Sequence, residues 1–320
     1  MKKLSVIIPV YNAEQYLEEC LNSVIGQTMP VSEMEILAVD DCSTDRSMEI
    51  LQDYAKRCDS IRILQTGRNA GAGGARNLAL AQAQGEYIGF VDSDDAIQPR
   101  MYEKLYEKAK SGDYDIVDSG IYIQEKDLAI LHTADEATGE QNDEKRCVNL
   151  VSGGYIVSKI FKRELLEKYP LCFRENVILE DMEYVMHYMC HAKTIGTVKE
   201  IFYIYRDTGA SSSKEHDPMK YHKNVTQAMQ AVYDTMHVFE GYESLREAVE
   251  YAILQLYSYG INNLLAAQGT YCEEEILDQL RELRGIRMRT VTGGYDNPYV
   301  QAKIAPQDIG IMQWNDQAFE

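Results

Sequence analysis

The fold of this chain is decided by one stretch of sequence, Gly85-Glu-Tyr-Ile-Gly-Phe-Val-Asp-Ser-Asp-Asp95. Its apolar run, Tyr87 to Val91, predicts a buried strand, and three carboxylates follow directly: Asp92, Asp94 and Asp95. In open α/β sheets, ligands bind at that end of the strands. Clustered carboxylates favour a divalent cation such as Mg²⁺ or Mn²⁺, which takes oxygen ligands. A polar loop with an Asp cap on the next helix is the alternative that this stretch alone leaves open.

Composition limits the classes of partner. The chain has 320 residues, of which 45% are hydrophobic, so it can form a packed catalytic domain with an appendage. Its formal charge is −19 and its pI is about 4.8. Nucleic acid is excluded as a partner because phosphate contacts need a basic face. Broad adhesion to anionic lipid is disfavoured for the same reason, but a few local Arg or Lys side chains can still bind a nucleotide diphosphate.

The first eight residues, two lysines followed by an apolar run, resemble the start of a signal peptide. The run breaks at Pro9 and meets no small-residue cleavage site, so we interpret it as a first strand. No stretch approaches the roughly 18 apolar residues of a membrane span. The seven cysteines are odd in number and include no C-x-x-C pair, which favours free thiols in a reducing compartment. We expect a cytoplasmic protein.

The first 120 residues alternate strand and helix signals. Strands are predicted at residues 4–10, 35–39, 61–64 and 87–91, and helical patterns lie at 17–25, around 50–54 and at 75–83. Ser43 and Thr44 offer capping oxygens for the second helix. This alternation predicts a Rossmann-like, mostly parallel sheet with helices on both faces.

The rest of the chain is less regular. We predict a strand at 114–123, a surface hairpin or excursion at 124–146, helices at 155–168 and 180–191, and a strand at 197–205. From Pro218 onward the pattern is helical. We therefore expect a catalytic domain over residues 1–215, with a donor half (1–120) and an acceptor half (121–215), followed by a helical region over 216–320.

Two polar segments follow the second and third strands. The run Asp40-Asp-Cys-Ser-Thr-Asp45 has the composition of a nucleotide pocket, in which Asp41 accepts the imide N–H of a base, or of a simple strand end with a cap. The run from Asn69 to Asn77 resembles a phosphate loop, with glycine N–H groups and Arg76 facing an anion, although a tight turn is the common alternative. A dinucleotide fingerprint is excluded because it should follow the first strand.

Later in the chain, Glu180 and Asp181 form an acidic pair. This pair suits either a general base for an attacking hydroxyl or a helix start stabilised by the helix dipole. His187 and His191 have zinc-ligand spacing but lack the Glu of H-E-x-x-H, so a zinc site is not expected. Tyr203-Ile-Tyr-Arg206 with Ser211-Ser-Ser213 offers a cation and hydroxyls for a phosphate, or a strand and a turn.

Together and in order, these segments resemble family 2 glycosyltransferases, which have the A-type glycosyltransferase fold. The resemblance is strong over residues 4–120. Its motifs are Ser5-Val-Ile-Ile-Pro-Val-Tyr-Asn12, the acidic run 40–45, the glycine run 69–77 and the stretch 85–95. It continues more weakly through Ser158-Lys-Ile-Phe-Lys-Arg-Glu-Leu165, the pair 180–181 and the run 203–206.

The resemblance implies a nucleotide-diphosphate sugar as donor, a UDP-sugar first. Donor contacts would come from Pro9, Tyr11, Asp41, Arg76, Asp92 and Arg206. Asp94 and Asp95 would ligate Mn²⁺ or Mg²⁺. Asp181, with Glu180 beside it, would be the catalytic base of an inverting transfer to a glycan or lipid-linked glycan.

Rival functions remain open at this point. A nucleotidyltransferase should have a basic, Gly-rich loop after the first strand, where this chain has Val10-Tyr-Asn12. A non-catalytic nucleotide-sugar-binding or interaction module on the same fold is the main alternative. A processive, membrane-embedded synthase is not expected. The apolar stripe of the C-terminal helices predicts core, an acceptor cover, a homodimer contact or a peripheral contact with the inner face of a membrane.

Overall fold

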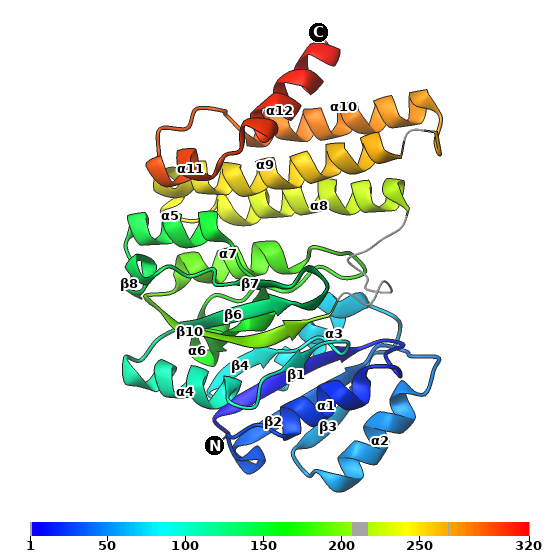
Figure 1. Cartoon of the computed structure of the whole chain (residues 1–320), viewed down its shortest axis with the longest axis vertical. Helices are drawn as coiled ribbons and strands as arrows, with labels where there is room; N and C mark the ends of the chain where they lie inside the picture. Colours follow the sequence, from blue (N-terminus) through cyan, green and yellow to red (C-terminus); the bar gives the residue numbers. More distant parts are fainter. Residues whose placement is uncertain (1, 207–216, 268, 320) are drawn as a thin grey trace. The chain divides into compact units, whose positions relative to one another are not determined.

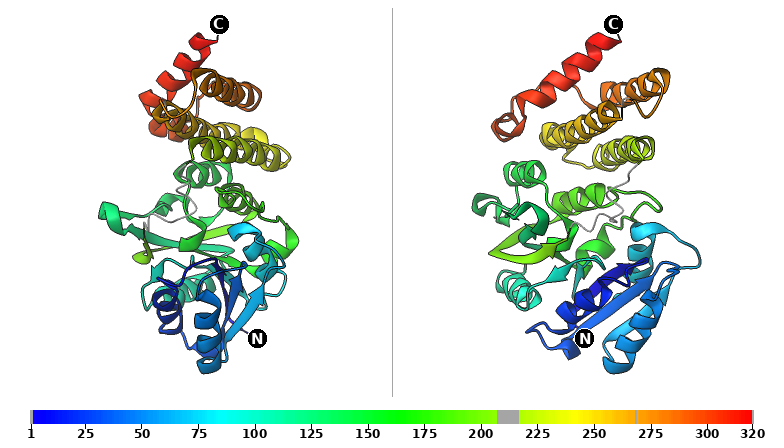
Figure 2. Two further views of the ribbon diagram at one scale, coloured as in Figure 1. Left: turned by 90° about the vertical axis from the view of Figure 1, so that its right-hand side faces the viewer. Right: turned by 45° about the vertical axis from the view of Figure 1, so that its right-hand side comes forward.

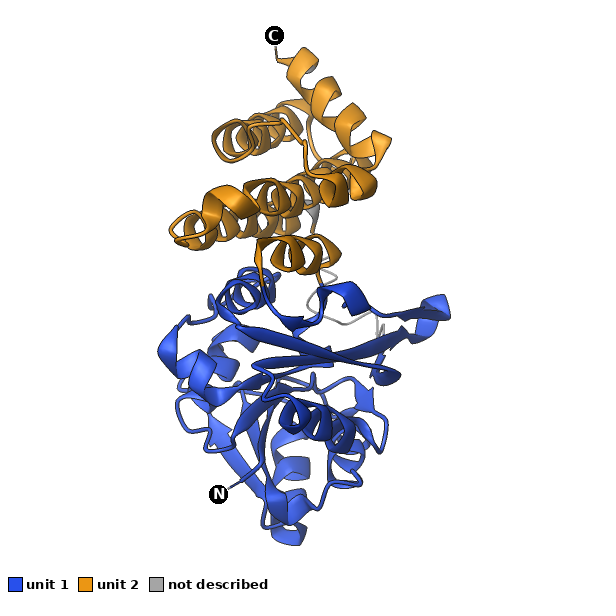
Figure 3. Ribbon diagram, turned by 90° about the vertical axis from the view of Figure 1, so that its left-hand side faces the viewer, with its two compact units in different colours: residues 1–141, 154–211 blue, residues 142–153, 212–320 orange. Residues whose placement is uncertain are grey.

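The computed structural model describes residues 2–206, 217–267 and 269–319 and divides into two compact units. Unit 1 comprises residues 1–141 and 154–211, and unit 2 comprises residues 142–153 and 212–320 (Figure 3). The domain boundary expected at residue 215 lies outside the described residues. A segment of the expected acceptor half, helix α5 (Asp143–Ser152), groups with the C-terminal helices.

Unit 1 is built on a ten-stranded sheet with the order β3-β2-β1-β4-β9-β6-β10-β5. Four neighbouring strands run parallel: β1 (Leu4–Val10), β2 (Met34–Asp40), β3 (Ile61–Gln65) and β4 (Tyr87–Phe90). Every residue of β1 and β2 is buried, as expected for parallel strands covered on both faces. The four strands predicted in the first 120 residues are confirmed.

The second half of the sheet mixes directions. Strand β9 (Lys159–Lys162) lies antiparallel between β4 and β6 (Ile116–Ile123), so β6 and β10 (Thr194–Tyr205) run in the same direction as β1. Short strands pair antiparallel with them: β5 (Ala96–Ile97) and β8 (Gly139–Glu140) with β10, and β7 (Leu128–Ile130) with β6. The segment 124–146, expected as a surface hairpin or excursion, supplies only one strand of a hairpin, β7, which pairs with β6. It also contains β8 and the start of a helix at Asp143.

Helices flank this sheet (Figures 1 and 2). They are α1 (Leu17–Ile25), α2 (Ser47–Arg57), α3 (Gly71–Leu80), α4 (Met101–Ser111), α6 (Arg163–Lys168) and α7 (Asp181–His191). Helix α3 packs on β1 and β2, and α4 packs on β6 and β10. The predicted fold class, a mostly parallel α/β sheet with a helical C-terminal region, is confirmed.

Two local predictions were wrong. Residues 155–168 were expected to form one helix, but only α6 is helical, and β9 precedes it. Ile160 and Phe161 of β9 are fully buried between two strands, and this tertiary pairing outweighs the local pattern. Helix α2 begins at Ser47, whose N–H donates to Asp45 at 2.9 Å, so Ser43 and Thr44 do not cap it.

Unit 2 is helical. Besides α5 it contains α8 (Pro218–Met236), α9 (Tyr242–Ala266), α10 (Glu273–Thr290), α11 (Pro298–Lys303) and α12 (Pro306–Ala318). Helix α9 is central, since it packs against α5, α8 and α10 and buries the predicted apolar stripe that includes Leu245, Ile253 and Leu264. Within the described ranges, no helix has the length and apolar character needed to cross a bilayer.

Candidate active site

The candidate site lies at the carboxyl ends of the parallel strands of unit 1. Pro9 is buried in β1, and Tyr11, just beyond the strand, is 50% exposed. Asp41 follows β2, and Asp92 follows β4 after one residue. Because these strands are neighbours and parallel, their ends bring the motif residues of separate segments to one edge, the usual ligand-binding edge of such sheets.

Asn12 joins the loops after β1 and β2. Its backbone has a positive φ of 48°, and its side-chain oxygen accepts the N–H of Thr44 at 2.7 Å. Its own N–H donates to Ser43 Oγ at 3.1 Å. The Thr44 hydroxyl also donates to the Asn12 side-chain oxygen, at 3.3 Å, so the hydroxyls predicted for a nucleotide pocket hold these two loops together.

The buried Asp41 carboxylate organises the start of α3. It accepts the N–H groups of Ala70 and Gly71, with Gly71 at 2.7 Å, and the hydroxyl of Thr66 at 2.6 Å. A carboxylate at a helix start is stabilised by these free donors and by the helix dipole. Asp41 thus connects the end of β2 to the glycine run.

The glycines of that run serve close packing. A Cβ atom at Gly73 would lie 2.1 Å from the carbonyl oxygen of Arg174, and one at Gly74 would lie 2.4 Å from Ala70 Cβ. Gly71 has φ +72° and donates its N–H to the Asp41 carboxylate, so this amide is already occupied and is not free to bind a phosphate as a phosphate loop would require. The run accommodates residues 173–176, the segment that leads to α7.

Arg76 of α3 is 4% exposed and lies between two carboxylates. One of its terminal nitrogens, Nη2, donates to Asp92 Oδ1 at 2.8 Å, and Nη1 donates to Glu180. Burial lowers the pKa of the guanidinium, but Asp92, Glu180 and Asp181 raise it, and the net shift is upward. Arg76 therefore stays charged and joins the donor-side loop to the acidic pair 180–181.

The acidic pair stands at the start of α7, as the sequence predicted. Glu180 is 7% exposed and pairs with Arg76, whereas Asp181 is half-buried in the first turn of the helix. Burial, and then the charge of Glu180, raise the pKa of Asp181 to about 7. A carboxylate with such a pKa is suited to accept a proton near neutral pH.

The loop after β4 is fastened to the end of β10. The Tyr203 hydroxyl donates to Asp95 Oδ2 at 2.6 Å and accepts the N–H of Asp92 at 3.1 Å. The N–H of Arg206 donates to Asp95 Oδ1 at 2.7 Å, and its guanidinium pairs with Glu19 at 2.8 Å. The sequence singled out the run Tyr203 to Arg206 for a phosphate, but the structure uses the Tyr203 hydroxyl to hold Asp95. Ser211-Ser-Ser213 lies outside the described residues.

Comparison with known proteins identifies the family. Residues 5–170 match the model of "Glycosyl transferase family 2". The chain belongs to this family. Its strand-end motifs are the residues through which the sequence resembled that family.

Individual relatives match part of the chain. The chain is 35% identical over 215 residues to an uncharacterized glycosyltransferase, EpsJ, of Bacillus subtilis (strain 168), a match covering 64% of this chain and 61% of EpsJ. It is 34% identical over 209 residues to a poly(ribitol-phosphate) beta-glucosyltransferase of Bacillus spizizenii, covering 63% of this chain and 32% of that enzyme. The chain thus spans less than two thirds of either relative.

A solved structure shows the same fold over nearly the whole chain. The structure of S. aureus TarS 1-349 in complex with UDP-GlcNAc superposes with a TM-score of 0.76 at 21% identity, covering 99% of this chain and 91% of that one. At this identity the likeness shows the fold alone.

The loop after β4 carries the carboxylates expected to hold a divalent cation. Burial, and then the charges of Asp92 and Asp94, raise the pKa of Asp95 to about 8, so this loop holds more negative charge than its surroundings neutralise. Within the described ranges, no three His, Cys, Asp or Glu side chains enclose a metal position. Each Asp95 oxygen already accepts one hydrogen bond, Oδ2 from the Tyr203 hydroxyl and Oδ1 from the Arg206 N–H. A cation at this loop would therefore be held by few protein ligands, with Asp94 as the expected one, and would complete its shell with water and substrate phosphates, as Mg²⁺ and Mn²⁺ commonly do.

Proposed function

We propose that this glycosyltransferase transfers a sugar from a nucleotide-diphosphate sugar, a UDP-sugar first, to a hydroxyl of a glycan or lipid-linked glycan, with Mn²⁺ or Mg²⁺ and with inversion of the anomeric carbon. One observation carries the proposal. Arg76 bonds both Asp92, on the donor-side loop, and Glu180, the neighbour of Asp181. A carboxylate of proton-accepting pKa therefore stands next to the loop expected to hold the donor.

The donor would contact the edge formed by the ends of β1, β2 and β4. The half-exposed Tyr11 ring offers a face for the base, Pro9 and Asp41 at the ends of the same strands would complete the base pocket, and Asp92 would bind the ribose. Arg206 would approach the diphosphate once it leaves Glu19. The bound UDP-GlcNAc of TarS supports the choice of a UDP-sugar.

Asp181 would act as the base. It takes the proton of the acceptor hydroxyl as the new bond from that oxygen to the anomeric carbon forms and the bond from that carbon to the diphosphate breaks. Attack opposite the departing diphosphate inverts the centre. Asp94, with Asp95 as its neighbour, would hold the cation, whose positive charge would stabilise the leaving diphosphate.

The proposal also covers the acceptor and the cellular compartment. The poly(ribitol-phosphate) substrate in the name of one relative supports a polymeric or lipid-linked acceptor. All seven cysteines are free, which supports a reducing, cytoplasmic compartment. A peripheral contact with the inner membrane face, or a homodimer through the helices of unit 2, remains part of this proposal.

The test is a panel of UDP-, GDP- and dTDP-sugars, with and without Mn²⁺, scored by thermal shift and by nucleotide release. We expect metal-dependent stabilisation by one donor, lost in Asp94→Asn and kept in the control Asp53→Asn, which alters an exposed carboxylate of α2. No response to any donor with any metal would overturn the proposal in favour of a binding or interaction module.

A further inference from the structure

Arg76 is placed differently from a residue that binds a diphosphate. Its side chain is almost fully buried, and its two terminal nitrogens are occupied by Asp92 and Glu180. We propose that Arg76 is a positioning residue: it fixes Asp92 and Glu180 relative to each other and thereby holds Asp181 in register with the donor site. This inference rests on the proposed function and assigns Arg76 no contact with the donor.

The surroundings of Arg76 keep its side chain in this place. The guanidinium lies over the ring of Phe173, 5.5 Å from its centre. The backbone of Phe173 is in turn held by Asn77, whose amide side chain accepts its N–H and donates to its C=O, both at 2.9 Å. Asn77 is the residue after Arg76 in α3, so one helix fixes both the Arg76 guanidinium and the Phe173 ring that covers it.

The guanidinium suits this task better than an ammonium group would. Its planar fork presents separate N–H groups in fixed directions, so one side chain can hold two carboxylates from distant parts of the chain. Glu180 is 104 residues away from Arg76 in sequence, and Asp92 is 16 residues away. A Lys at this position would keep the charge but would lose one of the two directed bonds.

The charges around Asp181 give the inference a distinctive readout. Glu180, Asp92 and Glu183 raise the pKa of Asp181, and Arg76 lowers it. Glu183 is itself paired with Arg174 at 2.5 Å. Removal of the charge of Glu180 should therefore lower the pKa of the base, and removal of Arg76 should raise it.

The experiment compares Arg76→Met, Arg76→Lys and Glu180→Gln in the full chain, with the best donor from the panel. For Arg76→Met we expect kcat to fall about 100-fold, as for a misplaced catalytic group, with the donor KM within about twofold of wild type. The acid limb of the pH profile should move up by about one pH unit in Arg76→Met and down in Glu180→Gln. Arg76→Lys should keep the limb near its wild-type position but recover only part of kcat.

The matched control is Arg62→Met. Arg62 also pairs with a buried carboxylate, Glu35 at 3.4 Å, but at the amino-terminal ends of β2 and β3. It should leave the pH profile unchanged. If Arg76→Met does not fold, Arg76→Lys and Glu180→Gln still carry the test.

Two outcomes would overturn the inference. A donor KM raised tenfold or more in Arg76→Lys with kcat unchanged would make Arg76 a donor ligand. Acid limbs that stay in place in both Arg76→Met and Glu180→Gln would remove its link to Asp181. Failure of the proposed function looks different, because the wild-type protein would then release no nucleotide from any donor.

Discussion

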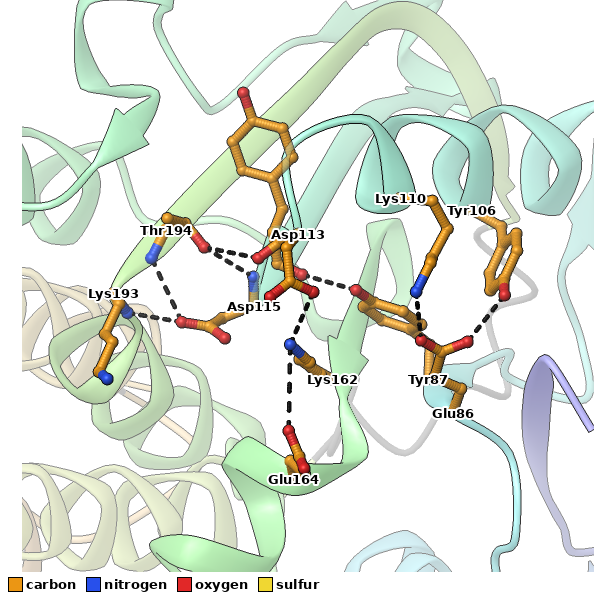
Figure 4. A network of polar contacts seen from close by, with 11 residues as sticks. Glu86, Tyr87, Tyr106, Lys110, Asp113, Asp115, Lys162, Glu164, Lys193 and Thr194 are labelled. Atoms are coloured by element: carbon orange, nitrogen blue, oxygen red, sulfur yellow. Dashed lines mark hydrogen bonds and ion pairs between the residues drawn. The ribbon is translucent and has the colours of Figure 1, made fainter. Parts of the chain in front are cut away.

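The two edges of the sheet in unit 1 hold their carboxylates in opposite electrostatic states. At the amino-terminal edge, Glu86 accepts hydrogen bonds from Tyr106 at 2.7 Å and Lys110 at 2.6 Å, and Asp113 pairs with Lys162 at 2.8 Å (Figure 4). Burial raises the pKa of Glu86, but the hydrogen bonds from Lys110 and Tyr106 lower it by more, so the net shift of this pKa is downward. Lys162 likewise lowers the pKa of Asp113.

At the carboxyl-terminal edge, the carboxylates crowd one another. Burial and neighbouring negative charges raise the pKa of Asp95 to about 8 and that of Asp181 to about 7. Paired carboxylates of the first kind stabilise the fold, whereas crowded ones of the second kind cost stability and are typical of functional sites. Burial alone therefore does not distinguish the two edges, whereas burial without sufficient compensating charge is found at the edge that carries the candidate site.

The largest effect should come from the crowded edge. Asp181→Asn removes the proposed base, so we expect nucleotide release in the presence of acceptor to fall by about a thousandfold, within the range that general-base catalysis contributes. Donor-induced thermal shift should be unchanged, because the donor loop is intact. Asp113→Asn at the opposite edge is the control and should retain wild-type rates. Comparable activity in Asp181→Asn would exclude Asp181 as the base.

The paired edge should show the reverse behaviour. Glu35, 4% exposed, accepts the Ser5 hydroxyl at 2.5 Å and the Gly85 N–H at 3.1 Å. Glu35→Ala leaves these buried donors unpaired, so the free energy of unfolding in urea should fall by about 3 kcal/mol. The kcat of the folded protein should stay within twofold. The exposed Glu49→Ala serves as control, and a tenfold loss of kcat in Glu35→Ala would contradict the division between the edges.

A third prediction concerns the connection between α3 and the acidic pair. Gly73→Ala places a Cβ against the backbone oxygen of Arg174, so residues 173–176 must shift. We expect a loss of about 2 kcal/mol in the free energy of unfolding, as for overpacking, together with a lower kcat because this segment leads to Glu180. Gly67→Ala is the matched control, since a Cβ there meets nothing within 4 Å. Wild-type kcat in Gly73→Ala would show that the segment does not position the pair.

How far the sequence alone leads depends on the distance between partners. Strand β1 has the predicted bounds because its nearly continuous apolar run is a local signal. Strand β9 was missed because Ile160 and Phe161 are strand residues only through β4 and β6, which come from other parts of the chain. Carboxylates at strand ends could be predicted to meet, since parallel strands end at one edge.

The side-chain partners within the site could not be predicted in this way. Arg76 and Glu180 are 104 residues apart, and no spacing rule joins them. The glycine run was interpreted through its composition, which is the same for a phosphate loop and for close packing against residues 173–176. Only the position of the Arg174 carbonyl separates the two.

The smallest predicted effect tests the cost of crowding itself. The pKa of Asp181 is raised from 3.8 to about 7. At pH values between these two, the folded protein therefore holds a proton that the unfolded chain has lost. Stability from this group therefore falls as the pH rises from about 4 to 7. Asp181→Asn should be more stable than wild type at pH 8 without metal or donor, and equal to it at pH 4. The difference at pH 8 should be only about 1 kcal/mol, because the partly exposed side chain keeps part of its hydration.

Glu86→Gln supplies the opposite sign for comparison. Its lowered pKa means that the stability from Glu86 is present above its unfolded pKa and is lost as the pH falls, so this variant should be less stable than wild type at pH 8. Both variants are followed by urea unfolding at the two pH values. If Asp181→Asn lost stability at pH 8 as Glu86→Gln does, Asp181 would belong with the paired carboxylates, and the contrast between the two edges would fail at the residue on which the proposed chemistry depends.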